Sequence, residues 1–203
     1  MIEVEKKLNL TAEEEARLLH GATFLGEKTF TDIYYDTADY ALTREDKWLR
    51  ERDGKWELKI NRNRSLERLG DQYDEIVNIP EILSRLNLDS RFNLDRGELK
   101  KIGYLPFATV TTTRGKYKKD GYTIDLDIVT YADTGFIYRL AEIETEATDE
   151  AHMDEVLKEL IAFIEKEGIE LRRADGKIGA YLRTVKPAHA EALIVAGVFR
   201  KHI

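Results

Sequence analysis

Hydrophobic and polar residues alternate with a period of two along much of this chain. In the first segment, Ile2 and Val4 fall on one face of an extended strand, whereas Glu3, Glu5 and Lys7 fall on the other. This pattern predicts a strand with one buried face and one charged face. Similar segments recur along the chain, and we expect about eight strands in all.

Two Asp-Gly pairs each separate two of these segments. Asp53-Gly54 lies between the strands predicted at 46–53 and 55–60, and Asp120-Gly121 lies between those predicted at 108–119 and 122–131. Asp-Gly favours a two-residue turn between antiparallel strands, so both pairs predict hairpins. The remaining strands are expected at residues 29–37, 72–79 and 136–145, and residues 61–70 read as a polar, arginine-rich loop.

Helical periodicity appears between and after the strands. The clearest helix spans 150–168, where apolar residues form one stripe, and Thr11 with Glu14 predicts the capped start of a helix that stops near Gly21. Two short helices are expected within 80–103, and two more at about 176–185 and 187–195. The pattern predicts one α+β domain over residues 1–203, built on a closed or nearly closed antiparallel sheet.

Composition limits the possible partners and surroundings. The net charge of −7 argues against non-specific nucleic-acid binding, which needs a basic surface. The absence of cysteine excludes disulfides and thiolate metal sites. No apolar run reaches transmembrane length and no signal peptide is seen, so we expect a cytoplasmic protein without a membrane partner.

The charged faces of the strands differ in sign. Acidic rows belong to the first, seventh and eighth strands, and basic rows to the third, fourth and sixth. Any single row could be a solvent face, but so many long rows exceed what solubility needs. A closed barrel would turn them inward and make a lumen suited to a polyanion held by metal ions on one wall and by ion pairs on the other.

The first strand resembles the sequence signature of a known protein family. Glu3-Val-Glu5-Lys-Lys7 is similar to the ExExK motif of CYTH proteins, the triphosphate tunnel metalloenzymes, which include thiamine triphosphatases, tripolyphosphatases and class IV adenylyl cyclases. ExExK alone is a weak motif in such a charged chain. Further matching segments follow in family order and resemble the thiamine triphosphatase branch: 32–37, 48–52, 56–59, 113–114, 125–127, 142–144 and 176–182.

The resemblance implies an eight-stranded antiparallel closed β-barrel with surrounding and C-terminal helices, and a Mg²⁺ cofactor that Mn²⁺ could replace. The implied metal ligands are Glu3, Glu5, Asp125, Glu142 and Glu144. The implied phosphate clamp is Lys7, Arg50, Arg52, Lys59, Arg114 and Lys177, with Glu75 beside the basic wall and Asp127 adjacent to a motif position. The sequence departs from the family at Lys6, where arginine is common, and at Glu51, between the two clamp arginines.

Hydrolysis of a triphosphate mainly requires positioning and stabilisation of charge. No histidine fits a general base, and we expect all four to be surface residues. A metal-bound water, or Tyr34 with its pKa lowered by Lys59, could act instead. Either alternative predicts that activity rises toward alkaline pH.

The expected function is a metal-dependent hydrolase that removes the terminal phosphate of a small-molecule triphosphate. Trp48 could stack on the thiazolium ring of thiamine triphosphate or could fill the end of the barrel. Inorganic tripolyphosphate is the second candidate substrate. An adenylyl cyclase and a non-catalytic polyphosphate-binding module remain as alternatives, and the chain could be a monomer or a homodimer.

Overall fold

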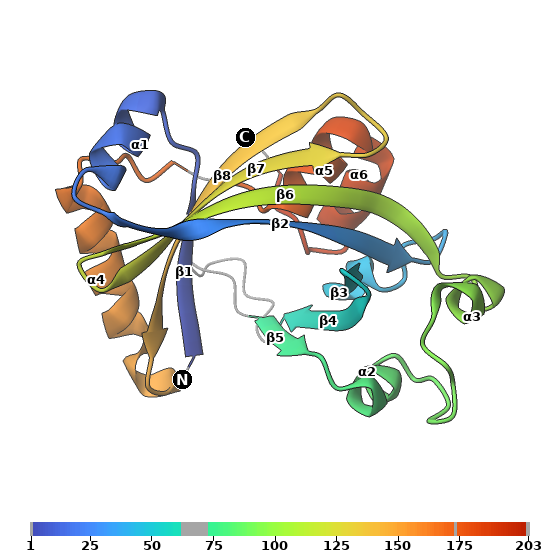
Figure 1. Cartoon of the computed structure of the whole chain (residues 1–203). Coiled ribbons are helices and arrows are strands. Elements are labelled where there is room, and N and C mark those ends of the chain that lie inside the picture. Colours follow the sequence, from blue (N-terminus) through green and yellow to red (C-terminus); the bar gives the residue numbers. More distant parts are fainter. Residues whose placement is uncertain (1, 62–72, 173, 202–203) are drawn as a thin grey trace. The chain divides into compact units, whose positions relative to one another are not determined.

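The computed structural model describes residues 2–61, 73–172 and 174–201, and it leaves out the side chains of Glu3 and Glu150 (Figure 1). The loop expected at 61–70 falls mostly outside these residues. The strands are β1 (Ile2–Leu8), β2 (Thr23–Asp36), β3 (Lys47–Arg52), β4 (Lys55–Asn61), β5 (Tyr73–Ile76), β6 (Leu105–Lys119), β7 (Tyr122–Tyr131) and β8 (Ile137–Ala147).

Helices lie between the strands and after them, as the periodicity predicted. They are α1 (Ala12–Leu19), α2 (Ile79–Arg85), α3 (Arg96–Lys101), α4 (Met153–Lys166), α5 (Lys177–Val185) and α6 (Pro187–Val195), with short 3-10 turns at η1 (Thr43–Glu45) and η2 (Glu150–His152). None of the described helices is long and apolar enough to cross a membrane.

The eight strands are hydrogen-bonded into one antiparallel sheet in the order β1-β8-β7-β6-β2-β3-β4-β5. The α+β class and the eight-stranded antiparallel sheet are confirmed. The acidic strands β1, β8 and β7 are neighbours in this order, as are the basic strands β3 and β4. Because β1 and β5 stand at the two ends of the order, closure of the sheet into a barrel stays a prediction.

The chain divides into two compact units. Unit 1 comprises residues 1–29, 112–130 and 136–180, and unit 2 comprises residues 30–111, 131–135 and 181–203. Strands β2 and β6 and helix α5 each contribute residues to both units. The expectation of one domain over residues 1–203 stays a prediction.

The core of unit 1 lies between the apolar faces of its strands and helix α4. Leu8 of β1 and Ile143 of β8 are fully buried, as are Leu160 and Ile164 of α4, which runs beside both strands (Figure 1). Leu18 of α1 joins the same cluster. Burial of these apolar faces is what drives this layer together, at roughly 25 cal/mol per Å² removed from water.

The core of unit 2 lies between β3, β4 and the two short helices α2 and α3. Leu49 and Leu58 are fully buried and face each other across the β3–β4 pair. Ile82 of α2 and Leu99 of α3 pack against them. The polar residues that alternate with Leu49 and Leu58 are therefore held on the opposite face of the sheet.

The predicted caps and turns are present. Thr11 accepts a hydrogen bond from the Glu14 amide, and the Glu14 carboxylate accepts one from the Thr11 amide, which forms a capping box at the start of α1. Both Asp-Gly pairs have positive φ at both residues, 47° and 80° in the first turn and 48° and 91° in the second. These values are typical of the two-residue hairpin turn that Asp-Gly favours.

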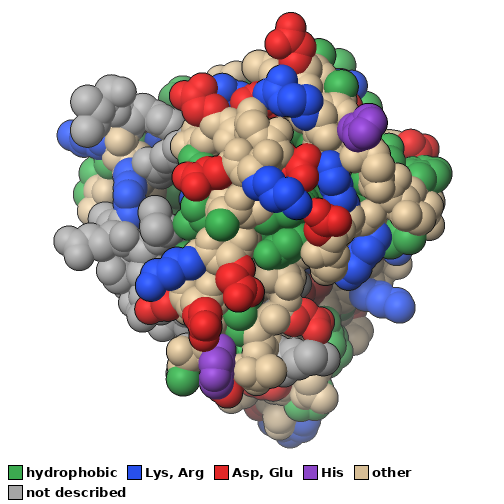
Figure 2. Space-filling view, turned by 90° about the vertical axis from the view of Figure 1, so that its left-hand side faces the viewer, with side chains coloured by type: hydrophobic (Ala, Val, Ile, Leu, Met, Phe, Trp, Pro, Cys, Tyr) green, Lys and Arg blue, Asp and Glu red, His purple; other side chains and the backbone are tan. Residues whose placement is uncertain are grey.

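Strand β2 begins six residues before the predicted start at residue 29. Its first part contains Gly26 at φ 129°, and Phe24 and Leu25 are both exposed. A glycine and two adjacent exposed apolar residues hide the period of two, so alternation could not reveal this part of the strand. On the face seen in Figure 2, acidic and basic side chains are interspersed.

Candidate functional site

Unit 1 brings together the acidic rows of three strands. In the β1–β8 pair, Glu5 lies opposite Glu144 and Lys7 lies opposite Glu142. In the β7–β8 pair, Asp125 lies opposite Glu142. Side chains directly opposite each other share a face of the sheet, so the register itself gathers these charges.

Arg114 of β6 binds three of these carboxylates. Its Nε and Nη2 donate hydrogen bonds of 2.7 Å to the two oxygens of Asp127, and its remaining donors contact Asp125 and Glu142. A planar guanidinium suits such bidentate contacts. Arg114, expected to bind phosphate, therefore lies among the residues expected to bind metal.

Lys7, Lys116 and Lys177 complete this cluster. Lys7 donates to Glu5 of its own strand, and Lys177, at the start of α5, contacts Asp127 and lies 3.5 Å from Glu142. We name these nine residues of unit 1 the carboxylate cluster: Glu5, Lys7, Arg114, Lys116, Asp125, Asp127, Glu142, Glu144 and Lys177.

The pKa values of two glutamates on β8, Glu142 and Glu144, are shifted in opposite directions. Burial would raise the pKa of Glu142, but the charges of Lys177, Lys7 and Arg114 outweigh it and lower the pKa to about 2. Burial raises the pKa of Glu144, and the nearby Asp125 carboxylate adds to this, against the opposing effect of Lys116. Neighbouring cations thus outweigh the burial of Glu142, whereas they compensate Glu144 only in part.

The cluster suits a divalent cation by its donor chemistry. Carboxylate oxygens are the protein ligands that Mg²⁺ prefers, and the buried Oδ1 of Asp125 lies 2.8 Å from the Lys116 ammonium, a cation whose place a metal ion could take. In the described part of the chain, however, no three acidic or histidine side chains are arranged as a ready metal site. Glu3, also expected to bind metal, has no described side chain.

Unit 2 holds a second charged cluster on β2, β3 and β4. Arg52 binds Asp32 through two hydrogen bonds, Nε to Oδ1 at 2.7 Å and Nη2 to Oδ2 at 2.9 Å. Arg50 is buried, with its Nε 3.7 Å from Asp32 and its guanidinium in contact with Glu57. The two arginines expected to bind phosphate therefore share the Asp32 carboxylate.

The expectation that Lys59 lowers the pKa of Tyr34 is wrong. Burial raises the pKa of Tyr34, and the largest opposing influence is Arg50, whose Nη1 donates to the Tyr34 hydroxyl at 3.4 Å. Lys59 instead contacts Glu75, its neighbour across the β4–β5 pair. The structure therefore gives no support to Tyr34 as an ionised base.

Trp48 has a packing position in unit 2. It is only 5% exposed, and its ring lies 6.2 Å from that of Phe199. Its Nε1 donates to Asp46 at 2.8 Å, and Asp46 also accepts from Asn61 and from Tyr73 of β5. This surrounding favours the alternative in which Trp48 fills the protein interior.

His189 of α6 corrects the expectation that the histidines lie at the surface. It is 1% exposed, its ring stacks on Tyr40 at 3.9 Å, and its Nε2 lies 2.8 Å from the Thr43 hydroxyl. That hydroxyl donates its one hydrogen to Asp36 at 2.7 Å, so His189 Nε2 must be the donor. Burial lowers the pKa of His189 to about 4.

Three residues near these clusters were not among the expected site residues. Asp32 and Lys116 each lie two positions from an expected residue of the same strand, so the period of two could have revealed both. Tyr138 of β8 donates to the Asp175 carbonyl at 2.8 Å, which fixes the backbone just before Lys177. No signal in the sequence joins Tyr138 to Asp175, because their contact depends on the tertiary structure.

A comparison with protein-family models decides the family. Residues 1–174 match the model of the CYTH domain. The chain belongs to the CYTH family. The resemblance to this family is thereby confirmed, and the match includes the first strand, six of the seven later segments (all but 176–182) and every candidate site residue except Lys177.

Two thiamine-triphosphatases align with almost the whole chain. Thiamine-triphosphatase of Homo sapiens is 29% identical over 211 residues, and that of Macaca fascicularis is 28% identical over 209 residues. Each alignment covers 96% of this chain and 90% of the relative.

Solved structures share the fold. The PH1819 protein of Pyrococcus horikoshii superposes with a TM-score of 0.58 and 24% identity, covering 89% of this chain and 98% of that one. HpAC1 from Hippeastrum, an adenylyl cyclase candidate described as revealing a dominant triphosphatase activity, superposes with a TM-score of 0.57 and 21% identity. That alignment covers 90% of this chain and 95% of HpAC1.

Proposed function

We propose that this CYTH protein is a metal-dependent triphosphatase that releases the terminal phosphate of thiamine triphosphate. One observation carries the proposal: curated thiamine-triphosphatases align with 96% of the chain. The charged residues expected from the family signature support it, because the described ones gather into two clusters rather than lying scattered. The phosphate clamp that the family resemblance implies includes cations of both clusters.

In this proposal the cations of both clusters bind the phosphate oxygens. Arg50 and Arg52 would exchange part of their contact with Asp32 for contact with the substrate, and Lys59 would leave Glu75 in the same way. Arginine forks suit the non-bridging oxygens of a phosphate, and lysine ammonium groups act as point charges.

The carboxylates would hold the metal ion. Glu5, Asp125, Glu142 and Glu144 supply oxygen ligands of the kind that Mg²⁺ prefers. When bound, a divalent cation supplies charge stabilisation at the phosphoryl oxygens and lowers the pKa of water. The chain's own residues would do the rest, since phosphoryl transfer depends mainly on positioning and charge.

Inorganic tripolyphosphate is the second candidate substrate. The stacking of Trp48 on thiamine was the feature that favoured the organic substrate, and the buried position of Trp48 weakens it. The description of HpAC1 supports triphosphatase activity over cyclisation for this fold. An assay of ATP with Mn²⁺ for cyclic AMP tests the cyclase alternative directly.

Phosphate release from thiamine triphosphate, tripolyphosphate and ATP, with Mg²⁺ and with EDTA, tests the proposal. We expect Glu5→Gln to lower the rate by roughly 100-fold or more, because it removes a charged ligand from the cluster. Asp154→Asn, on an exposed turn of α4, is the matched control and should retain the wild-type rate. Absence of release from all three substrates, or a Glu5→Gln rate equal to wild type, contradicts the proposal.

A further inference from the structure

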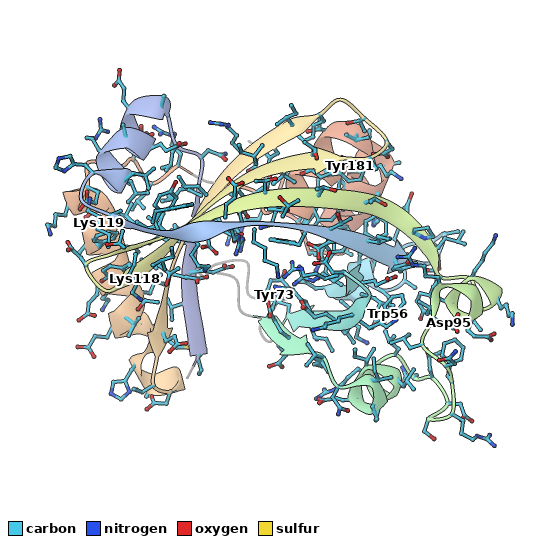
Figure 3. All side chains as sticks on the ribbon, viewed as in Figure 1. Trp56, Tyr73, Asp95, Lys118, Lys119 and Tyr181 are labelled. Carbon is cyan, nitrogen blue, oxygen red and sulfur yellow. The ribbon has the colours of Figure 1, made fainter. Side chains whose placement is uncertain are left out.

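Two lysines on β6 share one face of the strand but differ in their surroundings. Lys116 and Lys118 lie two positions apart, so alternation places both on the face that also carries Arg114. Lys118, labelled in Figure 3, is exposed. The Lys116 side chain is 40% exposed, and its Nζ lies 2.8 Å from Asp125 Oδ1 and 3.2 Å from Glu144 Oε1.

These two carboxylates need a cation between them. Asp125 is fully buried on β7, and Glu144 is its diagonal neighbour on β8. Arg114 binds the Oδ2 of Asp125 and leaves the buried Oδ1 to a second cation. Two carboxylates side by side repel each other, and a buried oxygen without a donor is costly. The Lys116 ammonium is the charge that compensates both.

We infer that Lys116 is a tethered cation that competes with a divalent metal ion for Asp125 and Glu144. The inference rests on the proposed use of these carboxylates as metal ligands. Mg²⁺ binds oxygen at about 2.0–2.1 Å, so a metal ion on these oxygens would lie too close to an ammonium 2.8 Å and 3.2 Å from them. The ammonium must therefore move away when the metal ion binds.

The position of Lys116 permits this movement. Its side chain is partly exposed, and a lysine stem has several rotatable bonds, so the ammonium can turn toward solvent or toward a bound anion. A triphosphate would accept the released charge. Lys116 consequently weakens metal binding to the free protein, and a substrate that draws the ammonium away relieves this competition, which couples the two binding events.

Direct binding of Mn²⁺ to the whole chain, followed by electron paramagnetic resonance without substrate, tests this inference. We expect Lys116→Met to tighten Mn²⁺ binding by roughly tenfold, because it removes a positive charge in contact with both ligands. Lys118→Met removes the same charge two residues away on the same strand and should change binding by less than about twofold. Lys116→Arg keeps the charge and should bind Mn²⁺ as the wild type does.

Three results would overturn the inference. One is wild-type Mn²⁺ affinity in Lys116→Met, another is an equal effect of both lysine substitutions, and the third is a lack of Mn²⁺ binding by every variant. Lys116→Gln, a second neutral substitution, must change binding in the same direction as Lys116→Met. Phosphate release separates the two proposals: if it still requires a divalent cation while Lys116→Met binds Mn²⁺ as wild type does, only the Lys116 inference fails.

Discussion

The Arg52 guanidinium binds the Asp32 carboxylate through two parallel hydrogen bonds, from Nε to Oδ1 and from Nη2 to Oδ2. Asp32 is 1% exposed and also faces the buried Arg50. One carboxylate thus compensates two arginines that the proposed function assigns to phosphate binding. This contact should contribute to the stability of the fold, and it also holds the two arginines that the proposed function assigns to phosphate binding.

We predict that Asp32→Ala lowers the free energy of unfolding by about 3–5 kcal/mol, because it removes the buried carboxylate from an ion pair shared by two arginines. Urea unfolding of both proteins measures the difference. Glu81→Gln is the matched control, since Glu81 forms an exposed pair with Arg85 on α2 and should cost less than about 1 kcal/mol. Equal effects of the two substitutions would show that the Asp32 contact is no stronger than a surface ion pair.

The lowered pKa of Glu142 predicts how the free energy of unfolding changes at acidic pH. Its pKa is lowered from 4.5 to about 2 in the folded protein, so its contribution to stability is fully present above pH 4.5. That contribution is lost as the pH falls from 4.5 toward 2, because protonation removes the attraction to Lys177, Lys7 and Arg114. The difference in unfolding free energy between wild type and Glu142→Gln should therefore shrink over this range. A difference that is constant between pH 3 and pH 7 contradicts the assignment.

The lowered pKa of His189 predicts a second pH dependence of stability, in a higher pH range than that of Glu142. Its pKa is lowered from 6.5 to about 4, so between these values the unfolded chain binds a proton that the folded chain does not. Stability should therefore fall as the pH falls from about 6.5 to about 4. In His189→Gln this part of the slope should be absent from melting temperatures measured at pH 4 to 7.

His152 is the matched control for His189. It is exposed and its pKa is raised, mainly by its hydrogen bond with Asp149, so His152→Gln should not remove the loss of stability toward acid pH. If both substitutions change the slope in the same way, the buried position of His189 is not the cause.

The environment of Tyr34 predicts how its substitution affects the dependence of the hydrolysis rate on pH. Because burial raises its pKa, the hydroxyl stays protonated at neutral pH and serves as a hydrogen-bond partner of Arg50. We expect Tyr34→Phe to raise KM for the triphosphate by several-fold while leaving the shape of the alkaline limb unchanged. Loss of the alkaline limb in Tyr34→Phe would instead identify Tyr34 as the base.

Much of the local structure could be predicted from the sequence. The period of two located the strands and their charged faces, and the two Asp-Gly pairs located two hairpins with the expected positive φ values. Thr11 and Glu14 located the start of α1. These features depend on neighbouring residues alone, and for that reason a linear pattern contains them.

The pairing of charges could not be predicted in the same way. The sequence divided the charged residues into a metal wall and a phosphate clamp, whereas Arg114 contacts Asp125 and Glu142 of the expected metal wall, and Lys177 lies 3.5 Å from Glu142. Which cation meets which carboxylate depends on register and strand order, and neither appears in a period of two.

The sequence by itself determined the strands, the turns and the sign of each charged face, because each is encoded in residues close together along the chain, and it determined the family through the order of segments along nearly the whole chain. Only the tertiary structure decided that His189 is buried while His152 is exposed, and that Lys116 contacts two carboxylates while Lys118 faces solvent. The physical reason is the same in both cases. Burial and ion pairing are properties of the segments that pack against a side chain, and those segments are distant in sequence.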